Sequence, residues 1–197
     1  MKPVAIVFAR APRLGAVKRR LARDIGARAA LRFHRATLCR LLRALARERR
    51  FDTVVAVTPD RAFLCAPGRV RRIAQGRGDL GERMGRAFRR FPHRRVALVG
   101  CDIPELGPAD LIAAFRLLGR CRAVFGPAED GGYWLVGMGP RRPARPFAGV
   151  RWSTAHALAD TLCNFRRHAP VLLRTLRDVD RAADLVRARP CGMRRSA

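Results

Sequence analysis

An aspartate that directly follows a buried strand is the residue of this sequence best placed to do chemistry. Residues 96–99 form a continuous apolar run, which is typical of a strand buried on both faces. The run ends at Gly100-Cys101-Asp102, and Pro104 then prevents regular continuation because it lacks a backbone N–H. In an α/β protein, a carboxylate at the carboxyl end of a strand points into the ligand crevice. Asp102 is therefore a candidate ligand residue, and capping of the following turn or helix is the structural alternative.

A basic loop follows the first expected strand, at residues 3–9. Pro12 and Gly15 predict a loop, and a helix begins near Val17. Free backbone N–H groups at such a helix start suit a phosphate, and the pattern of a Walker A loop is absent. Lys18 stands out because only two of the 42 basic residues are lysines, although a solvated basic helix start is the alternative. The side chains that could add charge-assisted contacts are Arg10, Arg13, Lys18 and Arg20.

Three further stretches carry acids or glycines at expected loops. Asp79 lies in a glycine-rich loop at 75–84 and can cap a helix that continues through 85–91. Residues 129–132, Glu-Asp-Gly-Gly, form either a simple turn or a close approach to a flat ligand, and the acids favour the ligand. Asp178 and Asp180 follow the last expected strand. We expect these loops to gather at one edge of the sheet.

The elements that must position these residues alternate between strands and helices. This alternation predicts an α/β layered domain with a largely parallel sheet, over residues 1–189. The tail at 190–197 is expected to be disordered. Strands are expected at 3–9, 52–58, 70–74, 95–100, 123–127, 133–138 and 171–176. Helices are expected from near 17, at 27–47, from a cap at Asp79 through 85–91, at 108–118, from an N-cap at Ser153 or Thr154 to about 168, and after Asp180.

Composition narrows the class of protein. A formal charge of +27 suggests nucleic acid, but arginine is spread over every segment and aromatic residues, at 7%, do not interleave with a basic stripe. Hydrophobic residues, at 49%, can fill a core, and no run is long enough to span a membrane. None of the six cysteines is in a C-x-x-C spacing, so we expect small buried hydrophobes and a cytoplasmic protein without a signal peptide.

The expected site chemistry is that of a metal and a nucleotide. Carboxylates without a matching His or Cys cluster suit a hard cation such as Mg²⁺ or Mn²⁺. A basic loop beside that cation suits a nucleoside diphosphate or triphosphate, whose transfer reactions need positioning and charge neutralisation. The order of residues shows no Ser-His-Asp or Cys-His arrangement, which disfavours acyl-transfer hydrolysis.

Six stretches of the chain together resemble a known family. They lie at 8–21, 78–84, 100–106, 126–137, 149–154 and 178–185, and the resemblance covers nearly the whole chain to about Val186. The sequence resembles the DUF2064 group of bacterial proteins, usually called glycosyltransferases of the GT-A type. That group is similar to the molybdenum-cofactor and phospholactate guanylyltransferases. GPAEDGGYWLVG and GVRWST are the most specific matches.

The resemblance implies a Rossmann-like nucleotide-diphospho-sugar transferase fold, with a mixed, mostly parallel sheet, one antiparallel strand and flanking helices. It implies that Lys18 contacts nucleotide phosphates, that Asp102 and Asp180 bind the metal, and that the glycines of the acidic turn line the substrate pocket. Lys18 and Asp102 are thus the candidate catalytic residues. The candidate residues for nucleotide or substrate binding are Arg10, Gly15, Lys18, Arg20, Asp79, Asp130, Gly131 and Gly132.

The chain departs from the family pattern in four places. Lys18-Arg19-Arg20-Leu21 stands where the family commonly has Lys-Thr-Arg-Leu, and Cys101 stands where it has Ser. Residues 178–184, DVDRAAD, replace Asp-Val-Asp-Thr-Pro-Glu-Asp, which weakens the assignment of Asp180. Pro104 removes the second carboxylate of an Asp-x-Asp glycosyltransferase motif.

These observations favour a metal-dependent transferase that moves a glycosyl group from a nucleotide-sugar to an acceptor that the sequence does not identify. The alternative is a nucleotidyltransferase that joins an NTP to a phosphorylated acceptor and releases pyrophosphate. Two further hypotheses are a basic nucleic-acid-binding protein and a catalytically decayed scaffold. The oligomeric state is not predicted.

Overall fold

A seven-stranded sheet with one antiparallel strand forms the centre of the protein. The computed structural model describes residues 1–187, and the strand order is β3-β2-β1-β4-β6-β5-β7. β6 runs antiparallel to both neighbours, β4 and β5, whereas the other pairs are parallel. The expected fold class is thereby confirmed. The strands are β1 (Val4–Arg10), β2 (Asp52–Thr58), β3 (Arg71–Ala74), β4 (Val96–Val99), β5 (Ala123–Pro127), β6 (Tyr133–Met138) and β7 (Val171–Leu172).

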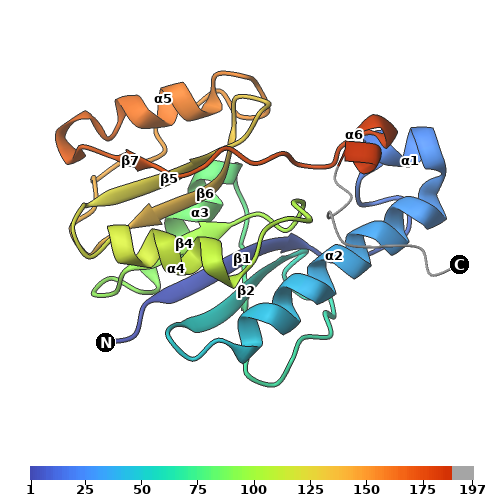
Figure 1. The fold of residues 1–197 in the computed structure, drawn as a ribbon, viewed down its shortest axis with the longest axis horizontal. Coiled ribbons are helices and arrows are strands. Elements are labelled where there is room, and N and C mark those ends of the chain that lie inside the picture. Colours follow the sequence, from blue (N-terminus) through green and yellow to red (C-terminus); the bar gives the residue numbers. More distant parts are fainter. Residues whose placement is uncertain (188–197) are drawn as a thin grey trace, which may run out of the picture.

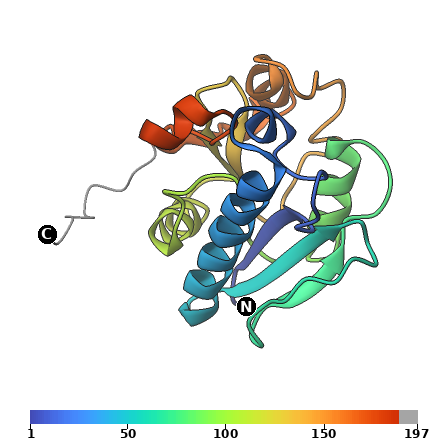
Figure 2. The same cartoon turned by 90° about the vertical axis from the view of Figure 1, so that its right-hand side faces the viewer.

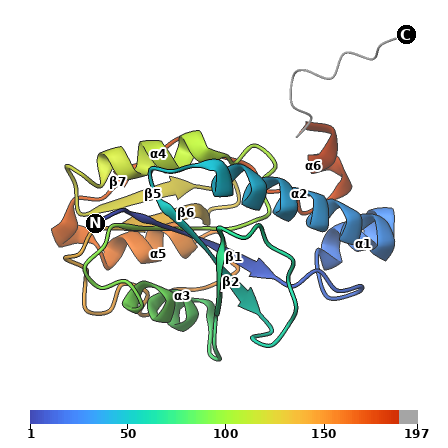
Figure 3. The same cartoon turned by 90° about the horizontal axis from the view of Figure 1, so that it is seen from below.

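Helices cover both faces of this sheet. α2 and α4 lie on one face, and α3 and α5 lie on the other (Figures 1 and 3). α1 and α6 contact each other beyond the end of the sheet, where α2 begins (Figures 1 and 2). The helices are α1 (Arg19–Ile25), α2 (Ala27–Arg47), α3 (Leu80–Arg89), α4 (Pro108–Leu117), α5 (Ala157–Cys163), the short 3₁₀ helix η1 (Arg166–His168) and α6 (Ala182–Arg187).

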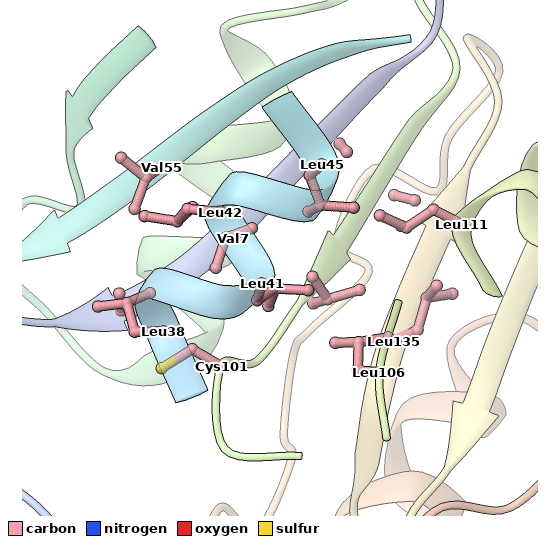
Figure 4. Close-up of a cluster of buried hydrophobic side chains, with 14 of the residues drawn as sticks. Val7, Leu38, Leu41, Leu42, Leu45, Val55, Cys101, Leu106, Leu111 and Leu135 are labelled. Carbon is pink, nitrogen blue, oxygen red and sulfur yellow. The ribbon is translucent and has the colours of Figure 1, made fainter. Parts of the chain in front are cut away.

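The long helix α2 packs on the sheet through one leucine-rich stripe. Leu38, Leu41, Leu42 and Leu45 recur at helical spacing, and each is fully buried against β1, β2 and α4 (Figure 4). Truncating one such leucine to alanine typically costs about 2–5 kcal/mol. Because both faces of the sheet are covered, β1 and β4 read as continuous apolar runs in place of an alternating pattern.

Two expected elements differ from the structure. The helix expected to start after an N-cap at Ser153 or Thr154 begins at Ala157, because the N–H of Leu158 donates to the carbonyl oxygen of Gly131 and not to that of Thr154. That helix ends at Cys163 and does not continue to residue 168. Only Val171–Leu172 forms the last strand, and the chain touches β5 again through a bridge between Ala128 and Leu176. The expected disordered tail, 190–197, lies outside the described residues.

The carboxyl ends of β1 and β4 lie side by side in parallel register, with Val7 opposite Val99. The loop into α1 therefore leaves the sheet beside Gly100-Cys101-Asp102. The segment that follows β7 crosses the sheet edge toward α1 and carries Asp178 and Asp180 to the same place (Figure 1). Over the described residues, no helix is both long and apolar enough to cross a membrane.

Candidate nucleotide and metal site

Lys18 lies between two carboxylates that come from distant parts of the chain. Its Nζ is 3.4 Å from Asp102 Oδ2 and 3.0 Å from Asp180 Oδ1. The Lys18 side chain is only 4% exposed, whereas those of Asp102 and Asp180 are 46% and 38% exposed. The structure therefore brings together three of the residues that the sequence singles out.

Lys18 makes these two contacts from an unusual backbone conformation. Lys18 precedes α1 with φ 47° and ψ 50°, a left-handed conformation that costs roughly 1–2 kcal/mol for a residue with a Cβ. Such outliers persist where surrounding interactions hold them, and they concentrate at functional sites. Here the two ion pairs hold the side chain in place.

Asp180 reaches the site because the segment before α6 is anchored on both sides. Val179 is fully buried against Leu21 and Ala30, and its N–H donates to the carbonyl oxygen of Asp102 at 3.3 Å. The Asp184 carboxylate accepts the backbone N–H of Asp180 at 3.0 Å. The departure from the family pattern at 178–184 thus leaves Asp180 in contact with Lys18.

The charges of the cluster reinforce one another. Burial lowers the pKa of Lys18, but the negative charges of Asp102 and Asp180 outweigh burial, so that its pKa is raised. Burial raises the pKa of Asp102, but the contact with His34 and the charge of Lys18 outweigh burial, so that its pKa is lowered. Lys18 and Asp102 are therefore both charged at neutral pH.

A basic cavity of about 450 Å³ opens beside this cluster, in the size range of small-molecule sites. Arg20 extends the cluster toward solvent, with its Nη1 at 3.2 Å from Asp180 Oδ2. The loop after β1 and the start of α1 supply the basic side chains. The charged residues of the lining are Arg10, Lys18, Arg19, Arg20, Asp102 and Asp180.

A second cavity, of about 400 Å³, lies on the other side of Asp102, and its lining is acidic where that of the first cavity is basic. It combines carboxylates with aromatic rings, and over the described residues its lining holds no lysine or arginine. The two cavities share Phe8, Gly100, Asp102 and Asp180. The aromatic and acidic residues of the second lining are Phe8, Tyr133, Trp134, Trp152, Asp102, Asp130, Asp178 and Asp180.

Asp178 is a member of this second cavity whose environment the sequence does not reveal. Burial raises its pKa, and the neighbouring charges of Asp180 and Asp130 raise it further. The position after a strand is the signal that points to it, but its proximity to Asp130 depends on the crossing of the C-terminal segment.

The turn at residues 129–132, Glu-Asp-Gly-Gly, lies beside the second cavity. Asp130 and Gly132 line it, and Asp130 Oδ1 accepts the N–H of Gly132 at 2.9 Å. Gly131 has φ +83°, and a Cβ there would be 2.2 Å from the carbonyl oxygen of Ala155. Gly131 therefore allows the turn to approach the loop before α5, and it lies outside the cavity lining.

Asp79 and Gly15 lie outside the lining of both cavities. Asp79 caps α3 as expected: its side chain accepts the N–H of Glu82 at 2.8 Å, and Glu82 accepts the N–H of Asp79 at 2.9 Å. Gly15 has φ +73° in the loop after β1. Their assignment to ligand binding stays a prediction, whereas Arg10 and Arg20 do line the basic cavity.

His34 and Cys101 are two members of the site that the sequence does not single out as site residues. His34, on α2, is 3% exposed, and its Nδ1 is 3.7 Å from Asp102 Oδ1. The Cys101 thiol donates to the same oxygen at 3.7 Å. Burial raises the pKa of the Cys101 thiol well above its usual value, and the charge of Asp102 raises it further. Nothing in the local sequence around His34 indicates that α2 places it there.

The donor set fits a divalent cation. Asp102 and Asp180 already converge on one cationic group, the Lys18 ammonium, and carboxylate oxygens are the ligands that Mg²⁺ and Mn²⁺ prefer. A metal ion held by these two carboxylates would compete with that ammonium for them.

Comparison with known proteins gives a family and a fold. The family model described as "Uncharacterized protein conserved in bacteria (DUF2064)" matches residues 41–154. A candidate nucleotide-diphospho-sugar transferase from Desulfovibrio desulfuricans G20 has a similar structure, with a TM-score of 0.88 and 30% sequence identity over 100% of this chain and 92% of that chain. No curated protein matches the sequence.

More distant structures share the fold alone. The 4-diphosphocytidyl-2C-methyl-D-erythritol synthase of Anaerococcus prevotii DSM 20548 has a TM-score of 0.59 and 11% identity, over 95% of this chain and 96% of that one. The manganese complex of Rv0371c from Mycobacterium tuberculosis H37Rv has a TM-score of 0.54 and 17% identity, over 95% and 98% of the two chains.

Proposed function

Because the chain belongs to the DUF2064 family, and because two cavities of opposite charge meet at its Asp102, we propose that it is a metal-dependent glycosyltransferase with a nucleotide-sugar donor. The meeting of the two cavities is the observation that carries the proposal. A nucleotide-sugar has an anionic diphosphate joined to a neutral ring, and the site offers one environment for each.

The basic cavity would hold the diphosphate. Lys18 is the buried ammonium, and Arg10 and Arg20 add guanidinium groups that can contact phosphate oxygens in pairs. When the sugar is transferred, the bond between its anomeric carbon and the diphosphate oxygen breaks. The nucleoside diphosphate then leaves with an added negative charge, which these cations stabilise.

Asp102 and Asp180 would hold the metal ion. When bound, Mg²⁺ or Mn²⁺ would supply charge neutralisation at the leaving diphosphate. The manganese complex of Rv0371c, a protein of the same fold, supports this choice of cofactor.

The acidic cavity would hold the neutral part of the substrates. Sugar hydroxyl groups can donate to Asp130 and Asp178, and the apolar face of a sugar ring can pack on Tyr133 or Trp152. A hydroxyl of the acceptor would attack the anomeric carbon and lose its proton to a carboxylate of this cavity. A phosphate group within about 4 Å of one of these carboxylates would be repelled by roughly 1–4 kcal/mol. The cavity therefore favours an unphosphorylated acceptor.

Nucleotidyl transfer is the second candidate, and Pro104 favours it. Pro104 removes the second carboxylate of the Asp-x-Asp motif that sugar transfer would use. The fold is also shared with a diphosphocytidyl-methylerythritol synthase. In this reaction an acceptor phosphate would attack the α-phosphorus of an NTP and release pyrophosphate, with Lys18 and Asp102 in the same roles.

A ligand screen followed by product analysis tests the proposal. We expect a sugar nucleotide with Mn²⁺ to raise the melting temperature of the protein more than an NTP does, because a ligand that binds the native state stabilises it. Turnover should then release a nucleoside diphosphate. Release of pyrophosphate from an NTP would favour the second candidate. If neither class of nucleotide binds with metal in calorimetry, or if Asp102→Asn binds both unchanged, both candidates are wrong.

A further inference from the structure

His34 presents an unpaired nitrogen to the site. Its Nε2 lies 2.9 Å from the carbonyl oxygen of Arg10, and because a carbonyl only accepts hydrogen bonds, Nε2 must carry the proton. In the neutral imidazole, Nδ1 is then a bare lone pair. This atom is buried and has no hydrogen-bond partner among the described residues, and it faces Asp102 Oδ1 at 3.7 Å. A cation placed near both atoms could be bound by the Nδ1 lone pair and by the carboxylate oxygen.

The contact with Arg10 is the one that a metal-binding histidine usually makes. Histidine ligands almost always donate their other ring N–H to a carbonyl or a carboxylate, which fixes the tautomer and the orientation of the ring. The Nε2–H of His34 is therefore already held by a carbonyl oxygen. Its Nδ1 accepts no hydrogen bond from the described residues and is free to bind a metal ion.

Cys101 contributes the third potential ligand atom of the same cluster. Its Sγ lies 3.7 Å from Asp102 Oδ1, and the three potential ligand atoms all lie within 4.8 Å of one another. In a tetrahedral zinc site, bond lengths of about 2.0–2.3 Å place ligand atoms roughly 3.3–3.8 Å apart. The two separations that involve Asp102 Oδ1, each 3.7 Å, are already close to that spacing.

We propose that His34, Cys101 and Asp102 form a site for a transition metal ion of the zinc class, distinct from the Mg²⁺ or Mn²⁺ site of the proposed function. The nitrogen, sulfur and oxygen donors favour a borderline-soft ion over Mg²⁺ or Ca²⁺. All three residues line the basic cavity, which gives the ion an entry path and leaves a fourth position for water or a substrate atom. The thiol releases its proton when it becomes a ligand.

The two sites use different oxygens of one carboxylate. Asp102 Oδ1 faces His34 and Cys101, whereas Oδ2 faces Lys18. The zinc-class ion therefore leaves the ion pairs of Lys18 intact. The inference shares only Asp102 with the proposed function and can fail or hold independently of it.

Cobalt binding tests the site directly, because thiolate ligation to Co²⁺ gives a charge-transfer absorption in the near-ultraviolet. The full chain with Cys65, Cys163 and Cys191 replaced by Ser removes two exposed thiols and the cysteine near the C-terminus. In this background we expect one equivalent of Co²⁺ to produce the charge-transfer band. Calorimetry with Zn²⁺ measures the affinity alongside it.

Four variants in that background decide the outcome. Cys101→Ser should abolish the band, and His34→Gln should weaken Zn²⁺ binding about tenfold or more, since even outer partners of metal ligands are worth that much. The matched controls Cys39→Ser and Asp160→Asn, at residues outside the lining of both cavities, should leave band and affinity unchanged. Melting curves establish that each variant is folded, and His34→Gln keeps the test decisive if Cys101→Ser does not fold.

The inference is overturned if the parent shows no band, if the band survives Cys101→Ser, or if His34→Gln leaves Zn²⁺ affinity unchanged. In those cases the contact of His34 with Asp102 is structural only. Binding of a nucleotide with Mn²⁺ to the Cys101→Ser variant would then show that the proposed function stands without this site.

Discussion

Replacing Lys18 by methionine tests whether the cluster is organised around one buried cation. Methionine keeps most of the length of the side chain and removes the charge. The carboxylates of Asp102 and Asp180 would then face each other without the ammonium that now lies 3.4 Å and 3.0 Å from them. We expect lower stability without metal and weaker binding of nucleotide, because the same ammonium would contact phosphate.

The structure sets the size of the loss. Removing one partner of a fully buried ion pair costs about 3–5 kcal/mol. Here water reaches the carboxylates, which are 46% and 38% exposed, so we expect about 1–2 kcal/mol. In a domain of this size, that loss lowers the melting temperature by roughly 2–8 °C. The control is Arg20→Met, because Arg20 contacts Asp180 at 3.2 Å but is 66% exposed, and its loss should cost at most about 1 kcal/mol.

Manganese provides the second half of the test. In Lys18→Met, Mn²⁺ no longer competes with an ammonium for the two carboxylates, so it should raise the melting temperature of this variant more than that of the wild type. At about 100 times its dissociation constant, a ligand contributes roughly 2.7 kcal/mol, enough to restore the lost stability. The reasoning is refuted if Lys18→Met melts like the wild type, if Arg20→Met loses as much, or if Mn²⁺ stabilises both proteins equally.

Three other outcomes follow from the same structure. Because the pKa of Asp102 is lowered and that of Lys18 is raised, the stability that their pairing contributes should be complete between about pH 5 and pH 9. It should be lost as the pH falls below about 3.9 or rises above about 10.4, a difference that urea titrations of wild type and Lys18→Met across pH would reveal. Gly131→Ala should destabilise the protein by more than 1–2 kcal/mol, since φ is +83° and the added Cβ meets backbone, whereas Gly132→Ala should cost less in the same melting assay. Asp79→Ala should cost about 0.5–2 kcal/mol through loss of the α3 capping box, and equal nucleotide affinity in this variant would remove Asp79 from the binding residues.

The sequence predicts the elements of this fold well because its signals are local. The apolar runs of β1 and β4, the leucine stripe of α2 and the cap at Asp79 each show in a few neighbouring residues. The late start of α5 could not be predicted, because it depends on a hydrogen bond from Leu158 to Gly131, in a turn far away in the sequence.

Some residues of the site can likewise be predicted from local sequence, whereas others cannot. Lys18, Asp102 and Asp180 stand out by residue type and by their places after strands, and parallel register explains why the first two meet. The opposite character of the two cavities and the position of His34 depend on packing between segments far apart in sequence. His34 is one turn before Leu38 in the buried stripe of α2, so its periodicity indicates only a core residue.

The Lys18–Asp180 ion pair joins residues that are 162 positions apart, so it can form only after most of the chain has been synthesised. During synthesis, β1, α2 and β4 emerge first and can pack while Asp180 is still unmade. Lys18 then has Asp102 as its only carboxylate partner in the cluster. Both cavities include Asp180, and the second also includes Asp178, so neither is complete until the crossing segment docks. Substrate binding therefore requires this segment, and a nascent chain that stalls before it would lack part of the lining of both cavities.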